Sequence, residues 1–563
     1  MSNRNTESHF SVAPASLDMG RSRFDRSCSY KTSFNVGDLI PFFVDEVLPG
    51  DTFALDTSMV VRLQTLLTPM MDNLYLDTYY FFVPNRLVWS HWKELMGENT
   101  SSAWIPSVEY SVPQVTSPTG GWSAGTIADY FGVPTGVDNL SISALPFRAY
   151  ALICNEWFRD QNLLDPLNIP VTDAAVAGSN GDNYITDIVK GGKPFVAAKF
   201  HDYFTSCLPG PQKAPDVLIP QGTSGQLPVY ALNTAVPSVD AASSLMFGVS
   251  NAAGAGSNRY ASQSGSGSNL ALSETDNISG SGNSRGVYPL NLWAVGSGAA
   301  AGATINQLRL AFQLQKLYEK DARSGTRYIE VLKAHFGVTS PDARLQRPEY
   351  LGGKRIPITV NQIVQQSQTT ESSPMGDVAG QSLTTDYASS FTHSFVEHGF
   401  VIGLCVARYD HTYQQGLNRM WSRKTRFDFY WPTLANIGEQ PVLNKEIYAQ
   451  GSGVVNSDTG KPYDDEVFGY QEAWADYRYK PNTVTGEMRS QYAQSLDSWH
   501  LADDYNSLPM LSASWIKEDA NTVNRVLAVS SSVSNQLFGD FYIKNLVTRV
   551  MPLYSVPGLI DHH

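Results

Sequence analysis

The segment FVIGLCVA, residues 400–407, is the stretch that decides the fold of this 563-residue chain. Successive side chains of a strand point to opposite faces, and here both alternating sets are apolar or small, as Ile402 and Cys405 illustrate. A strand that is apolar on both faces is covered on both sides by other parts of the protein. The segment therefore predicts a fully buried strand.

Further strands and a few helices are predicted around this segment. Strands are expected from residue 73 to Pro84, and near residues 426–431, 523–529 and 541–550. Apolar spacing of three and four residues predicts helices over residues 146–165, 304–324 and 328–336, and a short helical turn holds Trp89 and Trp92. This order lacks the regular strand–helix alternation of a doubly wound enzyme, so we expect a mainly β fold with long loops.

Composition restricts the function. The chain is 42% hydrophobic and 11% aromatic but only 17% charged, which is below the usual quarter, so many of its polar contacts are uncharged. Its net charge of -13 argues against a protein that coats duplex DNA or an anionic membrane with its whole surface. The amino end is polar and the longest apolar run is too short to span a bilayer, so we expect a soluble, intracellular protein.

The cysteines give no sign of a zinc site or a disulfide framework, because they lie far apart and form no C-x-x-C pair. They are Cys28, Cys154, Cys207 and Cys405. Buried thiols are the simplest interpretation of such isolated cysteines.

Three other patterns are candidates for chemistry. Gly296, Gly298 and Gly302 lie between a strand-like run and a helix, as in a phosphate-binding turn, but their spacing is G-x-G-x-x-x-G; the alternative is a hinge before a helix cap. HSFVEH, residues 393–398, resembles a metalloprotease motif with one residue too many, and polar strand residues are the alternative. The acidic run 464–466 fits a solvated turn better than a calcium loop.

The first forty residues form a polar segment with more basic than acidic side chains. Its cations are Arg4, Arg21, Arg23, Arg26 and Lys31. Such a segment is typical of an arm that lies outside the core.

Six segments closely resemble the major capsid proteins of microviruses, the small tailless single-stranded-DNA phages, in the gokushovirus branch. They are FFVPNRLVWSHWKELMGE from Phe81, LPFRAYALICNEWFRDQNL from Leu145, FHDYFTSCLPGPQK from Phe200, RSGTRYIEVLKAHFGVTSPDARLQRPEYLGG from Arg323, YQQGLNRMWSRKTRFDFYWPTLANIGEQ from Tyr413, and FGYQEAWADYRYKPNTVTGEMRS from Phe468. The resemblance runs from about residue 20 to the carboxyl end, except for residues 216–303.

This resemblance implies one eight-stranded antiparallel jelly roll, a viral capsid β-sandwich, with long loop insertions and a few helices. The expected parts are an interior-facing arm (1–44), the first part of the shell domain (45–215), a surface insertion (216–303) and the remainder of the shell domain (304–563). The Gly- and Ser-rich tract SQSGSGSNLALSETDNISGSGNSRG, residues 262–286, then lies within an insertion of one domain and does not link two domains.

The resemblance also implies a structural function without catalysis, cofactor or metal. We expect a capsid subunit of the virion, assembled in the cytoplasm of the host bacterium, that self-associates into a T=1 icosahedral shell around a circular single-stranded DNA genome. Its other expected partners are a small basic packaging protein, minor capsid or scaffold proteins and a receptor on the bacterial surface. The alternative is a nucleotide-dependent enzyme that uses the Gly296–Gly302 turn.

Three sets of site residues follow from this expectation. The five cations of the arm are the candidates for contact with DNA, since backbone phosphates require only positive charge on a mobile segment. The tip of the insertion is the candidate for host attachment, with Ser262, Leu270, Leu272, Ile278 and Gly286 as its markers. Subunit-interface candidates are Trp474, Tyr477, Arg478 and Tyr479, because interfaces favour aromatic and Arg side chains; for the aromatic residues a core role is the alternative.

Overall fold

The computed structural model describes residues 20–99, 109–215, 217, 305–367, 369 and 374–554, together with short strands between residues 229 and 294. The chain divides into two compact units, Met1–Lys213 with Glu319–His563, and Ala214–Tyr318. Within the described residues no helix is both long and apolar enough to cross a membrane.

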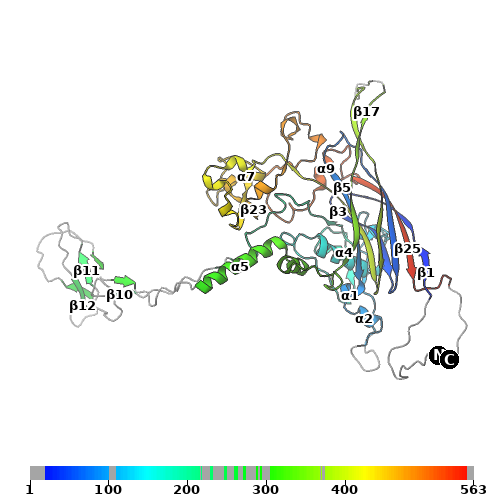
Figure 1. Cartoon of the computed structure of the whole chain (residues 1–563), viewed down its shortest axis with the longest axis horizontal. Coiled ribbons are helices and arrows are strands. Elements are labelled where there is room, and N and C mark those ends of the chain that lie inside the picture. The colour runs from blue at the N-terminus through cyan, green and yellow to red at the C-terminus, as the bar shows by residue number, and fades with distance from the viewer. Residues whose placement is uncertain are drawn as a thin grey trace. The chain divides into compact units, whose positions relative to one another are not determined.

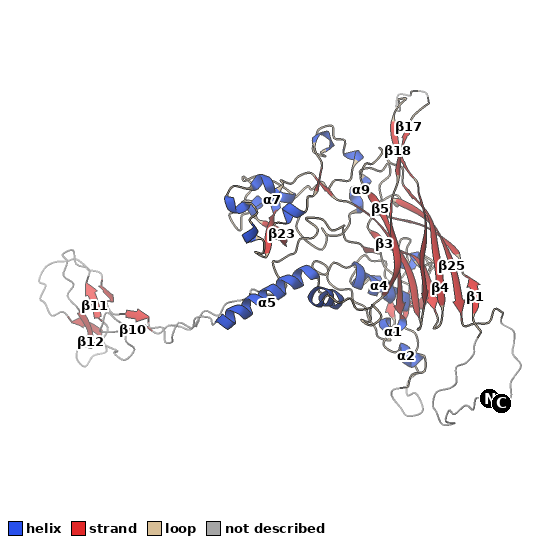
Figure 2. Cartoon of the chain, viewed as in Figure 1, coloured by secondary structure: helices blue, strands red, loops and turns tan. Residues whose placement is uncertain are grey.

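Two five-stranded sheets dominate the larger unit (Figures 1 and 2). The first contains, in order, β1 (Ser22–Asp25), β25 (Leu537–Arg549), β4 (Thr52–Leu63) and β19 (Thr384–Ser394), with β2 (Cys28–Phe34) also paired to β25. The second has the order β16 (Glu349–Pro357), β5 (Leu74–Pro84), β20 (Gly399–Tyr409), β3 (Asp38–Val47) and β9 (Phe195–Val196). All these pairings are antiparallel.

Consecutive long strands are shared between the two sheets. Thus β2 and β4 belong to the first sheet, whereas β3 and β5 belong to the second. Later in the chain, β19 and β25 belong to the first sheet, whereas β16 and β20 belong to the second. The mainly β fold is confirmed, and this interleaved strand order is consistent with the expected jelly roll. Each sheet therefore contains strands from both sides of residues 216–303, so these residues do not separate two β-sandwiches.

The strand predicted from residues 400–407 is β20, and it lies between β5 and β3 in the second sheet. On one face, Val401 and Cys405 belong to the core between the sheets, where Phe42 and Phe541 stack with ring centroids 4.8 Å apart. On the opposite face, Leu404 belongs to a second core formed with helix α4 (Leu145–Ile153). Both faces are buried, as the alternating apolar pattern predicts.

The predicted helices are also present, although the one predicted over residues 146–165 ends at Phe158. Helix α4 continues into a π-helical turn, Cys154–Phe158; α5 spans Ile305–Ser324; and α6 (Tyr328–Val331) continues into a second π turn, Leu332–Phe336. The Trp89 and Trp92 segment forms α1 (Asn85–Val88) and α2 (Trp92–Leu95). The other helices are α3 (Ile127–Tyr130), α7 (Asn444–Ile447), α8 (Ala475–Arg478) and α9 (Ala520–Asn524).

Several short strands form small sheets around the two large ones. They are β6 (Gln114–Thr116), β7 (Ser141–Ser143), β8 (Val176–Ala177), β17 (Val360–Val364), β18 (Val378–Ser382), β21 (Thr412–Tyr413), β22 (Glu439–Leu443), β23 (Val467–Glu472) and β24 (Asn482–Thr483).

Two predicted strands are wrong. Residues 426–431 begin with a 3₁₀ turn, Arg426–Asp428. The carboxylate of Asp428 caps this turn, because it accepts the backbone N–H groups of Lys424 and Thr425. Residues 523–529 contain the end of α9. Asp519 is the N-cap of this helix, and its carboxylate accepts the backbone N–H of Asn521. In both cases a local side-chain cap outweighs the aromatic or β-branched composition.

The amino-terminal segment and Cys28 also differ from expectation. Residues 22–44, which we expected in an arm, form β1, β2 and most of β3, and Phe34 and Ile40 are fully buried in the core. Alternating apolar residues in this segment outweigh its basic and polar composition. Cys28 is exposed, whereas Cys154, Cys207 and Cys405 are buried as expected.

The smaller unit, Ala214–Tyr318, contains short antiparallel strands. A four-stranded sheet has the order β13 (Leu270–Ser273), β12 (Arg259–Gln263), β11 (Met246–Val249) and β14 (Val287–Pro289). A separate pair joins β10 (Val229–Ala231) to β15 (Leu292–Ala294). Part of the Gly- and Ser-rich tract is therefore a β-hairpin, β12–β13.

Candidate assembly surface

Eight large side chains are exposed on the loop that precedes β22 and on the segment around α8. We call this set the aromatic surface. It consists of Met420, Trp421, Phe427, Phe429, Tyr430, Trp431, Tyr477 and Tyr479. Trp421 is 70% exposed and Phe427 is 62% exposed. Apolar area of this kind on a soluble chain is typical of a protein–protein contact.

Short turns hold the aromatic side chains in place. The loop consists of three 3₁₀ turns, Arg419–Ser422, Arg426–Asp428 and Pro432–Leu434. The indole N–H of Trp431 donates to the carbonyl of Arg426 at 2.8 Å. The surface is therefore built from hydrogen-bonded turns and not from a disordered loop.

Arg423 joins the loop to the α8 segment. Its guanidinium forms an ion pair with Asp476 and lies 4.2 Å from the ring centroid of Tyr477. The side chains of Arg423 and Asp476 are only 11% and 8% exposed. A shielded ion pair that also packs on a ring fixes the two segments relative to each other.

A small third core includes Ala475 of α8, the helix that carries Tyr477. This core also includes Tyr203, Phe204, Val442 and Phe468, the last two from the paired strands β22 and β23. The hydroxyl of Tyr203 donates to Glu446 at 2.8 Å. Burial raises the pKa of Glu446, which the interaction with Arg419 partly offsets.

The four interface residues proposed from the sequence have different environments. Trp474 is only 5% exposed, and its indole N–H donates to the carbonyl of Leu434 at 2.8 Å, so it supports the surface from inside. Tyr477 and Tyr479 are about half exposed. Arg478 forms an ion pair with Glu472 at 2.7 Å. Residues 420–431 were not among these candidates, although their dense aromatic and Arg content is the same signal.

Of the expected DNA-contacting residues, Arg23 lies in β1 and Lys31 in β2 of the first sheet. Arg21 and Arg26 flank β1, and Arg4 lies outside the described residues. Arg21 and Arg23 are exposed. Arg26 donates from Nε to Asp45 at 3.0 Å, and Lys31 lies 3.4 Å from Asp540. Two of the expected cations are therefore already paired with carboxylates.

The expected attachment residues belong to the smaller unit. Ser262 lies in β12 opposite Ala271, and Leu270 and Leu272 lie in β13. Ile278, Gly286 and the Gly296–Gly302 turn lie outside the described residues.

The remaining candidates for chemistry have structural contacts. Glu397 of HSFVEH pairs with Arg86 at 2.6 Å, and His393 lies 3.9 Å from Glu349. Asp464 accepts the backbone N–H groups of Gln450 and Gly451, both at 2.8 Å. Over the residues that the structure describes, no group of three or more His, Cys, Asp or Glu side chains is placed to hold a metal ion.

Comparison with known proteins agrees with the resemblance seen in the sequence. The family model described as "Capsid protein (F protein)" matches residues 14–559. The chain is 44% identical to "Capsid protein VP1" of Chlamydia phage 1 over 98% of both chains, and 42% identical to "Capsid protein VP1" of Bdellovibrio phage phiMH2K over 99% of both. It is 44% identical to "Capsid protein VP1" of Spiroplasma virus 4, over 94% of this chain and 93% of that one. The chain therefore belongs to the phage capsid protein (F protein) family and is a structural component of a virion, not an enzyme.

Proposed function

We propose that this chain forms a T=1 icosahedral shell around a circular single-stranded DNA genome, and that the aromatic surface is one of its contacts with neighbouring subunits. The observation that carries the proposal is the exposure of eight large side chains on hydrogen-bonded turns. The cores of subunit interfaces are enriched in Tyr, Trp, Phe, Met and Arg, which matches this composition.

Contact with the genome is proposed to be loose. Arg21 and Arg23 are exposed cations at the start of β1, the edge strand of the first sheet, and Arg4 adds a third in the amino-terminal segment. Arg26 and Lys31 contribute less, since carboxylates already offset their charge. So few cations on a chain with a net charge of -13 do not neutralise a genome, and a small basic packaging protein supplies the rest.

The smaller unit is proposed to be a surface protrusion that contacts a receptor on the host bacterium. This proposal is supported by the strand order, because both large sheets contain strands that precede the smaller unit in the chain and strands that follow it. None of the strands described in the smaller unit belongs to either large sheet. Loops and insertions carried on a rigid scaffold commonly provide recognition.

The test is co-expression of the chain with its phage partner proteins, followed by sedimentation and measurement of nuclease-protected DNA. The proposal expects fast-sedimenting particles that protect circular single-stranded DNA. Particles without protected DNA would contradict the genome role alone. Slowly sedimenting monomers at every salt concentration and pH would contradict shell formation itself.

A further inference from the structure

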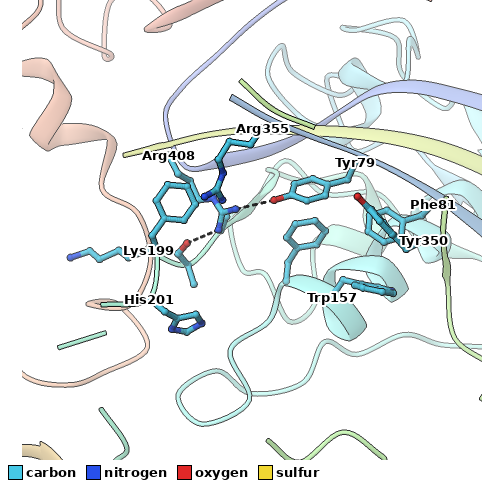
Figure 3. Close-up of a pocket in the computed structure, with 12 residues that line it drawn as sticks. Tyr79, Phe81, Trp157, Lys199, His201, Tyr350, Arg355 and Arg408 are labelled. Carbon is cyan, nitrogen blue, oxygen red and sulfur yellow. Dashed lines mark hydrogen bonds between the residues drawn. The ribbon is translucent and has the colours of Figure 1, made fainter. Parts of the chain in front are cut away.

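A cavity of about 400 Å³ lies on the second sheet, on the side away from the first sheet, between β5, β16 and β20 and the segments 157–158 and 197–201. Figure 3 shows its lining, with Phe81, Trp157 and Tyr350 on one side and Arg355 and Arg408 on the other. Binding sites for small molecules have volumes of roughly 300–1,000 Å³. The cavity thus has room for one compact ligand.

Three rings form the aromatic side of the cavity. The centroid of Trp157 lies 5.3 Å from that of Phe81 and 5.7 Å from that of Tyr350, and Phe81 and Tyr350 are 5.6 Å apart. The indole N–H of Trp157 donates to the carbonyl of Pro348 at 3.1 Å, which fixes its ring. Tyr350 is 44% exposed, whereas the guanidinium of Arg347 lies over the Trp157 ring, 4.2 Å from its centroid, so Tyr350 is the ring available to a flat partner.

Two arginines form the polar side. The guanidinium carbons of Arg355 and Arg408 lie 4.2 and 4.3 Å from the centroid of the Phe200 ring. Both also pair with Asp77, at 2.7 and 2.6 Å, and Arg408 donates to the hydroxyl of Tyr79 at 2.9 Å. The side chain of Arg355 is 51% exposed, so it retains donors for a further anion.

Nearby carboxylates partly offset the charge of the two guanidinium groups. Burial alone raises the pKa of Asp77, but the hydrogen bonds from Arg355 and the charge of Arg408 outweigh it, so the pKa is lowered and the carboxylate stays ionised. Asp77 thus pairs with both guanidinium groups, and the charge of Asp410 also acts on Arg355. Lys199, which also lines the cavity, lies 3.5 Å from Asp503 and is offset there.

We infer that this cavity binds one unpaired nucleotide of single-stranded DNA, with the base against Tyr350 and the phosphodiester at Arg355. A nucleobase supplies a flat aromatic face, and its phosphate supplies acceptors for the donors that the half-exposed Arg355 does not use on Asp77. The inference rests on the proposed function, because the enclosed genome is the source of unpaired bases. It adds a built site, with base stacking, to the loose contacts of the amino-terminal cations.

The test measures binding of a short labelled oligothymidylate, and of an abasic oligonucleotide of the same length, to the purified chain. Tyr350→Ala should weaken oligothymidylate binding by roughly five-fold or more, because stacking on one ring contributes about 1–3 kcal/mol per base. It should leave binding of the abasic strand unchanged. Arg355→Gln should weaken binding of both and reduce the slope of log K against log salt by about 0.7.

Two variants serve as matched controls. Tyr492→Ala removes a tyrosine that is 49% exposed and lies elsewhere on the surface. Lys354→Gln changes the cation next to Arg355 on β16. Lys354 pairs with Asp386 at 2.7 Å and does not line the cavity. Both should bind like the wild type. A photoreactive thymidine in the oligonucleotide should crosslink to the segment around Tyr350 or Trp157, located by mass spectrometry.

The outcomes separate this inference from the proposed function. Equal binding by the wild type and Tyr350→Ala, no binding by the wild type, or crosslinks only at other segments would overturn the nucleotide site even if shells form. Loss of shells in Tyr350→Ala with unchanged oligonucleotide binding would assign the cavity to a protein contact and overturn the site as well. Absence of shells from the wild type would overturn the proposed function but leave the binding result valid.

Discussion

At the scale of single residues, His411 is a buried group whose charge affects stability. Its side chain is 1% exposed, with Nδ1 3.1 Å from Asp503 and Nε2 3.1 Å from Glu518. Lys199 lies 3.5 Å from Asp503, so two cations face two carboxylates. Burial lowers the pKa of His411, but Asp503 and Glu518 outweigh it and raise the pKa to about 9.

The raised pKa predicts a loss of stability in mild base. A protonated His411 contributes its full stabilisation below its ordinary pKa of 6.5, and this contribution disappears as the pH rises through about 9. The loss is on the order of 3 kcal/mol. Urea unfolding from pH 6 to 9.5 should show this loss of stability in the wild type but not in His411→Gln. At pH 7 the free energy of unfolding of His411→Gln should be lower than that of the wild type by about 3–5 kcal/mol. His201→Gln, an exposed control, should follow the wild type; parallel curves for all three proteins would refute this account.

At the scale of elements, β20 has no space for a side chain at Gly403. A Cβ atom there would lie 2.8 Å from the ring of Tyr80 and 3.0 Å from Cβ of Phe43. Gly403→Val should therefore force β3 and β5 apart and reduce the free energy of unfolding by about 1–3 kcal/mol. Gly453→Val is the control, because a Cβ at Gly453 meets nothing within 4 Å. A similar thermal midpoint for both variants would show that the strand contacts are looser than described.

The sequence predicted correctly those elements in which the spacing of apolar residues reflects which faces are buried. The two-sided apolar pattern of residues 400–407 and the helical spacing of residues 150–158 both express how a segment faces a core. The strand predicted over residues 426–431 is absent, because the cap formed by Asp428 stabilises a local turn there. The cavity beneath Tyr350 could not be predicted, since its rings and arginines come from segments that the sheet order brings together. Trp157 and Tyr350, for example, are far apart in the sequence but have ring centroids 5.7 Å apart.

The smaller unit should be removable as an element. Deletion of residues 262–286 alone would cut β12 and remove β13, so the cleaner change replaces residues 216–303 with a short Gly- and Ser-rich linker. Because the two large sheets contain no strand from this segment, we expect shells to form while adsorption to host cells falls. Sedimentation and adsorption assays measure the two effects separately. Normal adsorption would refute the attachment role, and failure to form shells would show that the unit takes part in assembly.

At the scale of the whole molecule, the aromatic surface should control assembly but not folding. Trp421→Ala and Phe427→Ala remove side chains that are 70% and 62% exposed, so each should change subunit stability by no more than about 0.5 kcal/mol. If these side chains are interface anchors, each loss costs about 2 kcal/mol or more per contact. Shells should then require a much higher subunit concentration. Tyr387→Ala, which is 62% exposed on β19, is the matched control and should assemble like the wild type unless that face is also a contact.

The most direct test of the central claim is an electron cryo-microscopy map of particles assembled from the wild-type chain. The account predicts a closed T=1 shell in which the aromatic surface, including Trp421 and Phe427, is buried against a neighbouring subunit. A map in which these side chains face solvent, or a preparation that contains no closed shells in the presence of all phage partner proteins, would contradict it.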